Sequence, residues 1–343
     1  MKALVGLSWV LIVVVVGTVL AMGSRVLIPM ALAVLIWQLI NAVSEQIRRV
    51  RFAGQSAPRW LRQLLAVAVI VAALALMAWL VITNAAGVTA AAVGYQANLE
   101  RMLPALLAPF GLPAELSLGQ LIGEINLRGL IGSVTSALGT LVGNTGVILL
   151  YLIFLMLEQE TFAQKVDALL PDPERNARAR RLLADIEKRV ETYLGIKTLV
   201  SAVTAFLSFL VLRIVGVDYA EFWGLLVFLL NFIPIFGSIF GVVLPVLLTL
   251  VQFAEPAPVI AVAVGLGAIQ FTLGNIVEPR LMGMSLNLSP LVIMVSLAVW
   301  GSLWGVVGML LCVPITVIAM IICAHFEPTR PVAVLLSANG RVD

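Results

Sequence analysis

Long runs without a charged residue constrain the fold of this chain more than any other feature. Seven such runs cover residues 3–24, 26–44, 63–99, 129–157, 222–254, 256–277 and 281–326, with His325 taken as neutral. A helix of about 20 apolar residues spans the hydrocarbon core of a bilayer. Because every run except the shortest reaches or exceeds that length, and the shortest approaches it, we predict an all-α polytopic membrane protein.

The overall composition supports a membrane location. Of the 343 residues, 62% are apolar and only 11% are charged. A soluble globular domain carries about 25% charged residues. So few charges cannot cover a surface that faces water on all sides, and lipid is expected to cover part of this one.

Groups for catalysis and metal binding are scarce. The sequence has one histidine, and its two cysteines, Cys312 and Cys323, lie within an apolar run and are typical of small core residues. It contains no HExxH zinc motif, no GxSxG nucleophile elbow and no phosphate-binding loop of the Walker type. We therefore expect no enzyme activity, no metal, no cofactor and no nucleic-acid partner.

The basic loop at 45–62 sets the expected orientation. It contains five arginines against one acidic residue, Glu45. The positive-inside rule places such a loop in the cytoplasm. The N-terminus is then cytoplasmic too, with spans at 4–22, 26–44 and 63–83. The first 22 residues resemble a signal peptide, but their only basic residue is Lys2 and a second apolar run follows at once, which favours an uncleaved span.

Successive spans are expected to cross the membrane in alternating directions, and this divides the rest of the chain. Span four is expected at 133–157 and span five at 196–215, with a cytoplasmic amphipathic helix between them after a break at 171–173. The expected divisions are N-terminal spans at 1–83, an external amphipathic segment at 84–132, span four with the cytoplasmic helix at 133–195, a hairpin-containing transport region at 196–325 and a cytoplasmic tail at 326–343.

The uncharged run at 222–254 does not fit one ordinary span. Its 33 residues would form a helix about 50 Å long, whereas the hydrocarbon core is about 30 Å thick. Asn231, Pro234, Gly237 and Gly241 lie in its middle, where proline disfavours a continuous helix and glycine permits a tight reversal. We predict a re-entrant hairpin with two short arms and a tip near 234–237.

A second interrupted run covers 281–326, and its arms are expected to be longer. Glycines and a proline again lie inside it, and an ordinary span at 257–276 separates it from the first. Span plus hairpin then occurs twice with opposite polarity, an inverted repeat of the kind that builds transporter sites. The residues expected to shape the hairpins are Pro234, Gly237, Gly241, Pro279, Gly283, Gly301, Gly305, Gly308 and Pro314. The alternative is two kinked helices whose GxxxG motifs only permit close packing.

Polar side chains in this region are candidates for a solute or ion pathway. Asn231, Gln270 and Asn275 are neutral amides, and a polar group within a membrane is costly enough to suggest a role. Glu278 is the one credible carboxylate at membrane depth. A simple ion pair between Glu278 and Arg280 is the alternative interpretation.

Several motifs in the C-terminal half resemble those of one bacterial permease family, the autoinducer-2 exporter family. The matching stretches are WGLL at 223–226, NFIPIFGS at 231–238, GNIVEPRLMG at 274–283, LSP at 288–290, WG at 300–301, Gly305, GML at 308–310 and VP at 313–314. Each is weak alone, and together they are specific. The N-terminal half is too generic in sequence to add to the resemblance.

The resemblance implies an inner-membrane homo-oligomer that exports autoinducer-2, a small polar signal of quorum sensing. Some similar proteins are described as sodium(lithium)/proton antiporters, so an antiporter using Glu278 is a second hypothesis. A non-transporting scaffold, whose hairpins only build an oligomer, is a third. The expected partners are the lipid bilayer and a small polar solute or cation.

Overall fold

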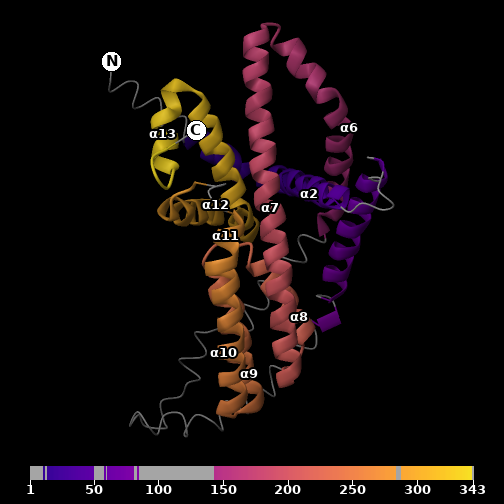
Figure 1. Cartoon of the computed structure of the whole chain (residues 1–343), viewed down its shortest axis with the longest axis vertical. Coiled ribbons are helices and arrows are strands. Elements are labelled where there is room, and N and C mark those ends of the chain that lie inside the picture. The colour runs from indigo at the N-terminus through magenta and orange to yellow at the C-terminus, as the bar shows by residue number, and fades with distance from the viewer. Residues whose placement is uncertain are drawn as a thin grey trace. The chain divides into compact units, whose positions relative to one another are not determined.

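The computed structural model describes residues 11, 14–49, 58, 60–80, 83–84, 143–282 and 287–341 (Figure 1). Within these residues the chain is helical, and the extended pairing is limited to one antiparallel bridge between Leu288 and Ser337. Most of the expected external segment, half of the expected first span and Gly283 lie outside the described residues.

The helices differ greatly in length. In chain order they are α2 (Ser24–Arg49), a helix at Trp60–Leu80, α6 (Thr145–Leu169), α7 (Pro173–Val215), α8 (Ala220–Leu230), α9 (Phe236–Phe253), α10 (Pro256–Thr272), a π-helix (Leu273–Val277), α11 (Glu278–Met282), α12 (Pro290–His325), a 3₁₀ turn (Glu327–Thr329) and α13 (Arg330–Leu336). Among the described residues, six helices are long and apolar enough to cross a bilayer, and α6 is a seventh if its two halves, bent by 62°, form one span. The predicted all-α polytopic fold is confirmed.

Large apolar side chains remain exposed along these helices. Val264, Phe271 and Leu291 are 65%, 63% and 72% exposed. In water, apolar patches spread over several helices would drive association, whereas lipid tails match them. Exposed apolar side chains of this kind suit contact with lipid tails.

Two compact units divide the chain. Unit 1 contains Met1–Ile70, Asn144–Gly195 and Met282–Asp343, and unit 2 contains Val71–Gly143 and Ile196–Leu281. The long helix α7 contributes its first half to unit 1 and its second half to unit 2. Each unit holds one of the two predicted interrupted segments.

In unit 1, α2 packs against α6. Ile40, Ala66 and Leu152 form a small buried cluster, and Nε1 of Trp37 donates a hydrogen bond to Oε1 of Gln159 at 3.2 Å. The helix α6 runs to Leu169, beyond the predicted end of span four at 157. The helix continues past 157, but it bends by 62° between Gln159 and Thr161, where charged residues have replaced the apolar sequence.

The second interrupted segment is a hairpin in unit 1. The helical path of α12 breaks at Gly305, whose φ of +60° and ψ of −141° suit glycine and few other residues. The two arms, 290–304 and 306–325, lie against each other, because Ser296 hydrogen-bonds the hydroxyl of Thr316 and donates to the carbonyl of Cys312. This confirms the predicted hairpin and places its tip at Gly305.

One expectation for this hairpin, and the alternative of a packing motif, need correction. Pro314 lies buried within the second arm rather than at the tip, where it could shape the reversal. Gly301 and Gly305 do not form a packing motif, since Gly301 faces Met309 of its own hairpin and a side chain at Gly305 would meet nothing within 4 Å. Gly305 is needed for its backbone conformation instead.

The expected tail at 326–343 is folded through residue 341. After the 3₁₀ turn and α13, the chain pairs with the segment that precedes α12. The backbone N–H of Ser289 donates to Leu336 O and that of Ala338 donates to Asn287 O, both at 2.9 Å. The C-terminal segment therefore fixes the start of the α12 hairpin.

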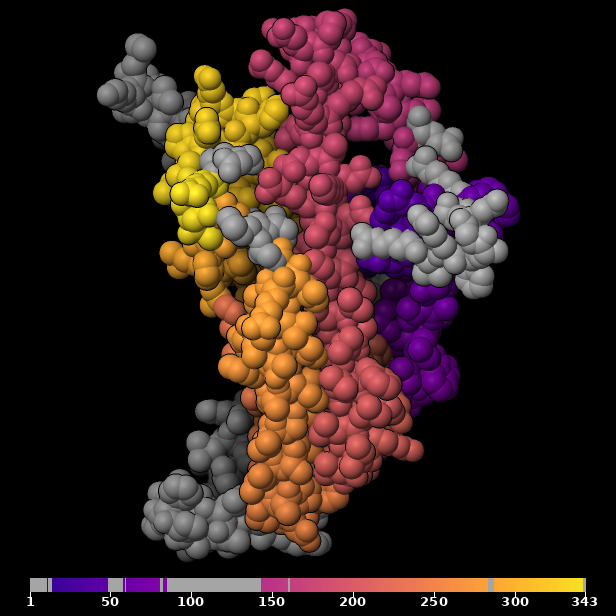
Figure 2. All heavy atoms as spheres, in the orientation of Figure 1, coloured from indigo at the N-terminus to yellow at the C-terminus, as the bar shows by residue number. Residues whose placement is uncertain are grey.

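In unit 2, the second half of α7 is the helix against which α8 and α10 pack. A Cβ at Gly224 of α8 would lie 3.0 Å from Phe209, and one at Gly265 of α10 would lie 2.9 Å from Val211. These glycines let both helices approach α7 closely. Figure 2 shows α10 running alongside this half of α7.

The first interrupted segment is also a hairpin. The helix α8 ends at Leu230, residues 231–235 form the tip, and α9 begins at Phe236 and packs on α8. A side chain at Gly241 would make an ordinary contact with Val227 of α8. The predicted hairpin is confirmed, but only one arm is short: α8 has 11 residues, whereas α9 has 18 and is long enough to cross a bilayer.

Candidate functional site

A stripe of polar side chains runs along one face of α7 in unit 2. Lys197, Ser201, Thr204 and Ser208 follow the four, three, four spacing that places residues above one another on a helix. They are buried, with exposures of 6%, 0%, 1% and 2%. Polar residues in an apolar span are costly, so a buried stripe of them indicates a function or a structural partner.

Two buried amides join this stripe. Nδ2 of Asn231, at the start of the hairpin tip, donates to Oγ of Ser201 at 2.9 Å. Nε2 of Gln270, on α10, donates to Oδ1 of Asn231 at 3.0 Å. Asn231 and Gln270 are 5% and 8% exposed. The structure thus brings two predicted pathway residues together and adds Ser201 as their shared partner on α7.

The tip that carries Asn231 is tight. Ile235 has a φ of +63° and a ψ of −57°, and the N–H of Phe236 reaches Pro234 O at 2.6 Å. This is the rare and strained form of the γ-turn. A Cβ at Gly237 would lie only 1.8 Å from Leu230 O. Strain of this kind persists where the surrounding structure holds it, often at functional sites.

A π-helix interrupts the regular winding between α10 and α11. It covers Leu273–Val277 and ends two residues before Pro279, which lacks the N–H that would bond to the carbonyl of Asn275 in an α-helix. The proline therefore accounts for the irregular turn. Single π-turns inside helices are frequent at functional sites.

Asn275 lies apart from the other two amides. Its side chain is exposed on the π-helix, so the expected cluster of three amides is a pair plus a separate residue. An exposed amide within an apolar span must meet water, a solute or another polar surface, because lipid offers no hydrogen-bond partner. Its position remains compatible with a pathway.

Glu278 forms a largely buried ion pair with Lys197. The distance from Nζ to Oε1 is 2.6 Å, and the two side chains are 8% and 15% exposed. The expected partner, Arg280, is exposed, as is Pro279. The alternative of a Glu278–Arg280 pair is therefore wrong, because π-turn winding directs Glu278 to α7 while Arg280 lies elsewhere on the helix.

We call this set the polar array: Lys197, Ser201, Asn231, Gln270 and Glu278. The array joins α7, the hairpin tip and the α10–α11 helix by two neutral hydrogen bonds and one ion pair. Its donors and acceptors suit hydrogen bonding to a small polar solute, and its single carboxylate is already balanced by an ammonium group. Among the described residues, no group of three His, Cys, Asp or Glu side chains could hold a metal ion.

The sequence contains a signal for the two residues of the polar array that were not predicted, Lys197 and Ser201. Within the apolar run that follows residue 197, the polar residues recur with helical spacing, which marks one face of α7. The sequence does not single out Lys197, since nothing in it pairs this residue with one 81 positions later. That pairing depends on the tertiary fold.

Interrupted helices that carry buried polar groups within a membrane are typical of secondary transporters. The chain belongs to the AI-2E transporter family, whose match covers residues 9–327. It is 30% identical over 350 residues to "AI-2 transport protein TqsA" of Escherichia coli, covering 98% of both chains. It is also 30% identical over 342 residues to a "Putative transport protein" of Haemophilus influenzae, covering 98% of this chain and 96% of that one.

A shorter match has a higher identity. A "Putative transport protein" of Borreliella burgdorferi is 35% identical over 223 residues, which is 64% of this chain and 61% of the relative. Together with the family match, these relatives identify the chain as a multi-pass membrane transporter. The predicted family is confirmed.

Proposed function

We propose that the chain exports a small polar solute by secondary transport, with autoinducer-2 as the first candidate. The observation that carries the proposal is the hydrogen-bonded chain from Ser201 through Asn231 to Gln270, buried within an apolar bundle. Neutral amides and a hydroxyl match an uncharged polar solute. The relative TqsA, by name an AI-2 transport protein, supports the choice of solute.

The proposed pathway runs beside the polar array. Asn231 and Gln270 would exchange their mutual hydrogen bond for bonds to the solute, and Asn275 would contact it at the π-helix. The hairpin-containing region at 196–325 would open the pathway to each side of the membrane in turn. The sequence has no ATP-binding motif of the Walker type, so a solute or ion gradient would supply the free energy.

A sodium(lithium)/proton antiporter is the second candidate function, and the buried ion pair favours it. If Lys197 moved away, the carboxylate of Glu278 would be left in a low-dielectric site that attracts a cation or a proton. Exchange of Lys197 for a cation at Glu278 is one route to coupled transport.

We place the protein in the bacterial inner membrane as a homo-oligomer with both termini in the cytoplasm. The basic loop at 45–62 supports this orientation. Exposed polar groups such as Asn275 would then face either the solute pathway or another subunit. The third hypothesis is a scaffold without transport activity, and the following experiment distinguishes it from the two transport functions.

Uptake into proteoliposomes tests these functions against one another. The purified full-length protein would be reconstituted, and the flux of autoinducer-2 would be compared with that of sodium, each with and without a pH gradient. The proposal predicts autoinducer-2 flux above that of empty liposomes. Sodium flux driven by the pH gradient, without autoinducer-2 flux, would favour the antiporter, and the absence of both would favour the scaffold.

A further inference from the structure

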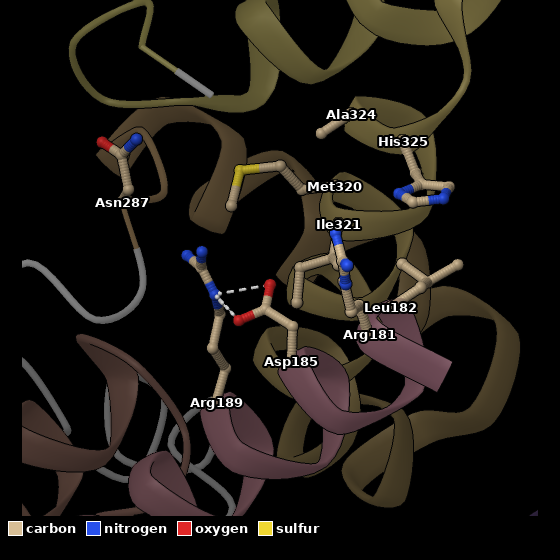
Figure 3. Close-up of a pocket in the computed structure, with 9 residues that line it drawn as sticks. All are labelled: Arg181, Leu182, Asp185, Arg189, Asn287, Met320, Ile321, Ala324 and His325. Carbon is tan, nitrogen blue, oxygen red and sulfur yellow. Dashed lines mark hydrogen bonds and ion pairs between the residues drawn. The ribbon is translucent and has the colours of Figure 1, made fainter. Parts of the chain in front are cut away.

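A cavity in unit 1 lies between the first half of α7 and the end of α12 (Figure 3). Its volume is about 230 Å³. Met320 and Ile321 line it and are 3% and 7% exposed, so part of its wall is apolar and belongs to the interior of the unit. No residue of the polar array lines this cavity.

Cationic side chains line the same cavity. Figure 3 shows Arg181 and Arg189 extending from α7 towards α12, which contributes His325. The carboxylate of Asp185 accepts two hydrogen bonds of 3.1 Å from Nε of Arg189, so these two charges balance. In the described part of the chain, neither Arg181 nor His325 has a hydrogen-bond or ion-pair partner. The guanidinium of Arg181 therefore gives the cavity an uncompensated positive charge beside its apolar wall.

The cavity lies at the end of the apolar sequence of α12 and within the charged segment of α7. In α7, charged residues dominate before Lys197 and apolar residues follow it, and the residues that line the cavity lie eight to sixteen positions before Lys197. In α12, the apolar sequence ends at His325, and Glu327 and Arg330 come next. The positive-inside rule places both ends on the cytoplasmic side. This boundary is the depth at which phospholipid headgroups lie.

We propose that this cavity binds the phosphate group of an anionic amphiphile, with an acidic phospholipid as its source. Guanidinium groups bind phosphate oxygens with matched geometry, and basic pockets between membrane helices on the cytoplasmic side bind anionic headgroups. The apolar wall suits the glycerol and acyl part of a lipid, which inorganic phosphate lacks. The inference is independent of which solute the protein transports.

Native mass spectrometry of the full-length protein in detergent tests this proposal. Phosphatidylglycerol, phosphatidylcholine and glycerol 3-phosphate would be titrated separately and in competition. The variants are Arg181→Gln and the double change Arg181→Gln with His325→Gln. Arg178→Gln is the matched control, because Arg178 is exposed on the same helix and does not line the cavity.

We expect phosphatidylglycerol to bind more tightly than phosphatidylcholine. Arg181→Gln should weaken that binding about fivefold, as the loss of one basic residue near an anionic headgroup does. The double variant should weaken it further, and Arg178→Gln should leave it unchanged. Effective competition by glycerol 3-phosphate would support a phosphate site with a soluble ligand.

Three results would overturn the proposal. One is wild-type protein that binds no phosphatidylglycerol, and another is a double variant that binds it as tightly as the wild type. The third is an equal loss of binding in Arg178→Gln and Arg181→Gln, which would indicate general electrostatic attraction rather than a site.

Discussion

Residues of the polar array differ in how much they are expected to contribute to stability. Lys197 and Glu278 bear full charges away from water, and each is tolerable because the other is 2.6 Å away. Taking one partner from a buried pair leaves an uncompensated charge, whereas replacing both by apolar residues is often neutral or stabilising. The pair can therefore be tested for its contribution to stability separately from transport.

The first prediction concerns this pair. Lys197→Met or Glu278→Leu alone should destabilise the protein by about 3–5 kcal/mol, because each leaves a buried charge without its partner. The double variant should recover most of that loss. Unfolding in detergent, followed by circular dichroism, measures the effect. Single variants as stable as the wild type would show that the two side chains do not form the pair.

The second prediction concerns Asn275, whose replacement should change transport and not stability. It is exposed, and none of its side-chain atoms takes part in the hydrogen bonds of the polar array. Asn275→Leu should therefore leave thermal stability within about 1 kcal/mol of wild type, as exposed substitutions do, while it abolishes solute flux. Normal flux in that variant would remove Asn275 from the pathway.

The sequence alone identified some of these residues. Asn231 and Gln270 were recognisable because a polar group in an uncharged run is costly wherever the chain places it, and Glu278 because it is a carboxylate at the edge of such a run. Lys197 and Ser201 were not among the predicted pathway residues, and the alternative that paired Glu278 with Arg280 is wrong. The close approach of α7 to the α10–α11 helix could not be predicted from local sequence, because it depends on tertiary packing such as that of Gly265 on Val211.

At the scale of elements, both hairpins use glycine in the same way near the reversal. A Cβ at Gly237 would lie 1.8 Å from Leu230 O, and one at Gly308 would lie 1.9 Å from Trp300 O. In each case the glycine lets one arm approach a backbone carbonyl of the other arm near the reversal. The glycines in the sequence predicted a hairpin. They did not show which glycine is needed because a side chain would clash, and which, like Gly305, is needed for its backbone conformation.

The hairpins give the third prediction. Gly237→Ala and Gly308→Ala should each destabilise the protein by about 1–3 kcal/mol or more, since a backbone oxygen has little room to shift. Thermal unfolding in detergent measures this. Gly267→Ala is the control: nothing lies within 4 Å of its Cβ position in α10, so alanine should stabilise that helix by about 0.5–1 kcal/mol. Equal behaviour of all three variants would contradict the tight reversals.

At the scale of the whole molecule, hydropathy and motifs predicted the class of fold and the family. The apolar runs predicted most of the described membrane helices because a bilayer needs a fixed length of apolar helix. Helices longer than the bilayer requires were harder to predict. An example is the 43-residue α7, which continues from a charged segment into an apolar span. The opposite polarity of the two hairpins stays a prediction.

The central claim is that the solute crosses beside the polar array. Autoinducer-2 flux in proteoliposomes, compared between Asn231→Ala and Thr249→Val, tests it most directly. Thr249 is fully buried and bonds only Pro245 O of its own helix among the described contacts, so its variant removes a buried hydroxyl outside the array.

Asn231→Ala leaves Ser201 and Gln270 without their partner and removes the amide that would bind the solute. Losing such a buried bond costs about 1–3 kcal/mol, so flux should fall about tenfold or more while the protein still inserts. Thr249→Val should keep flux near the wild-type value. Equal flux in Asn231→Ala and wild type would contradict the account.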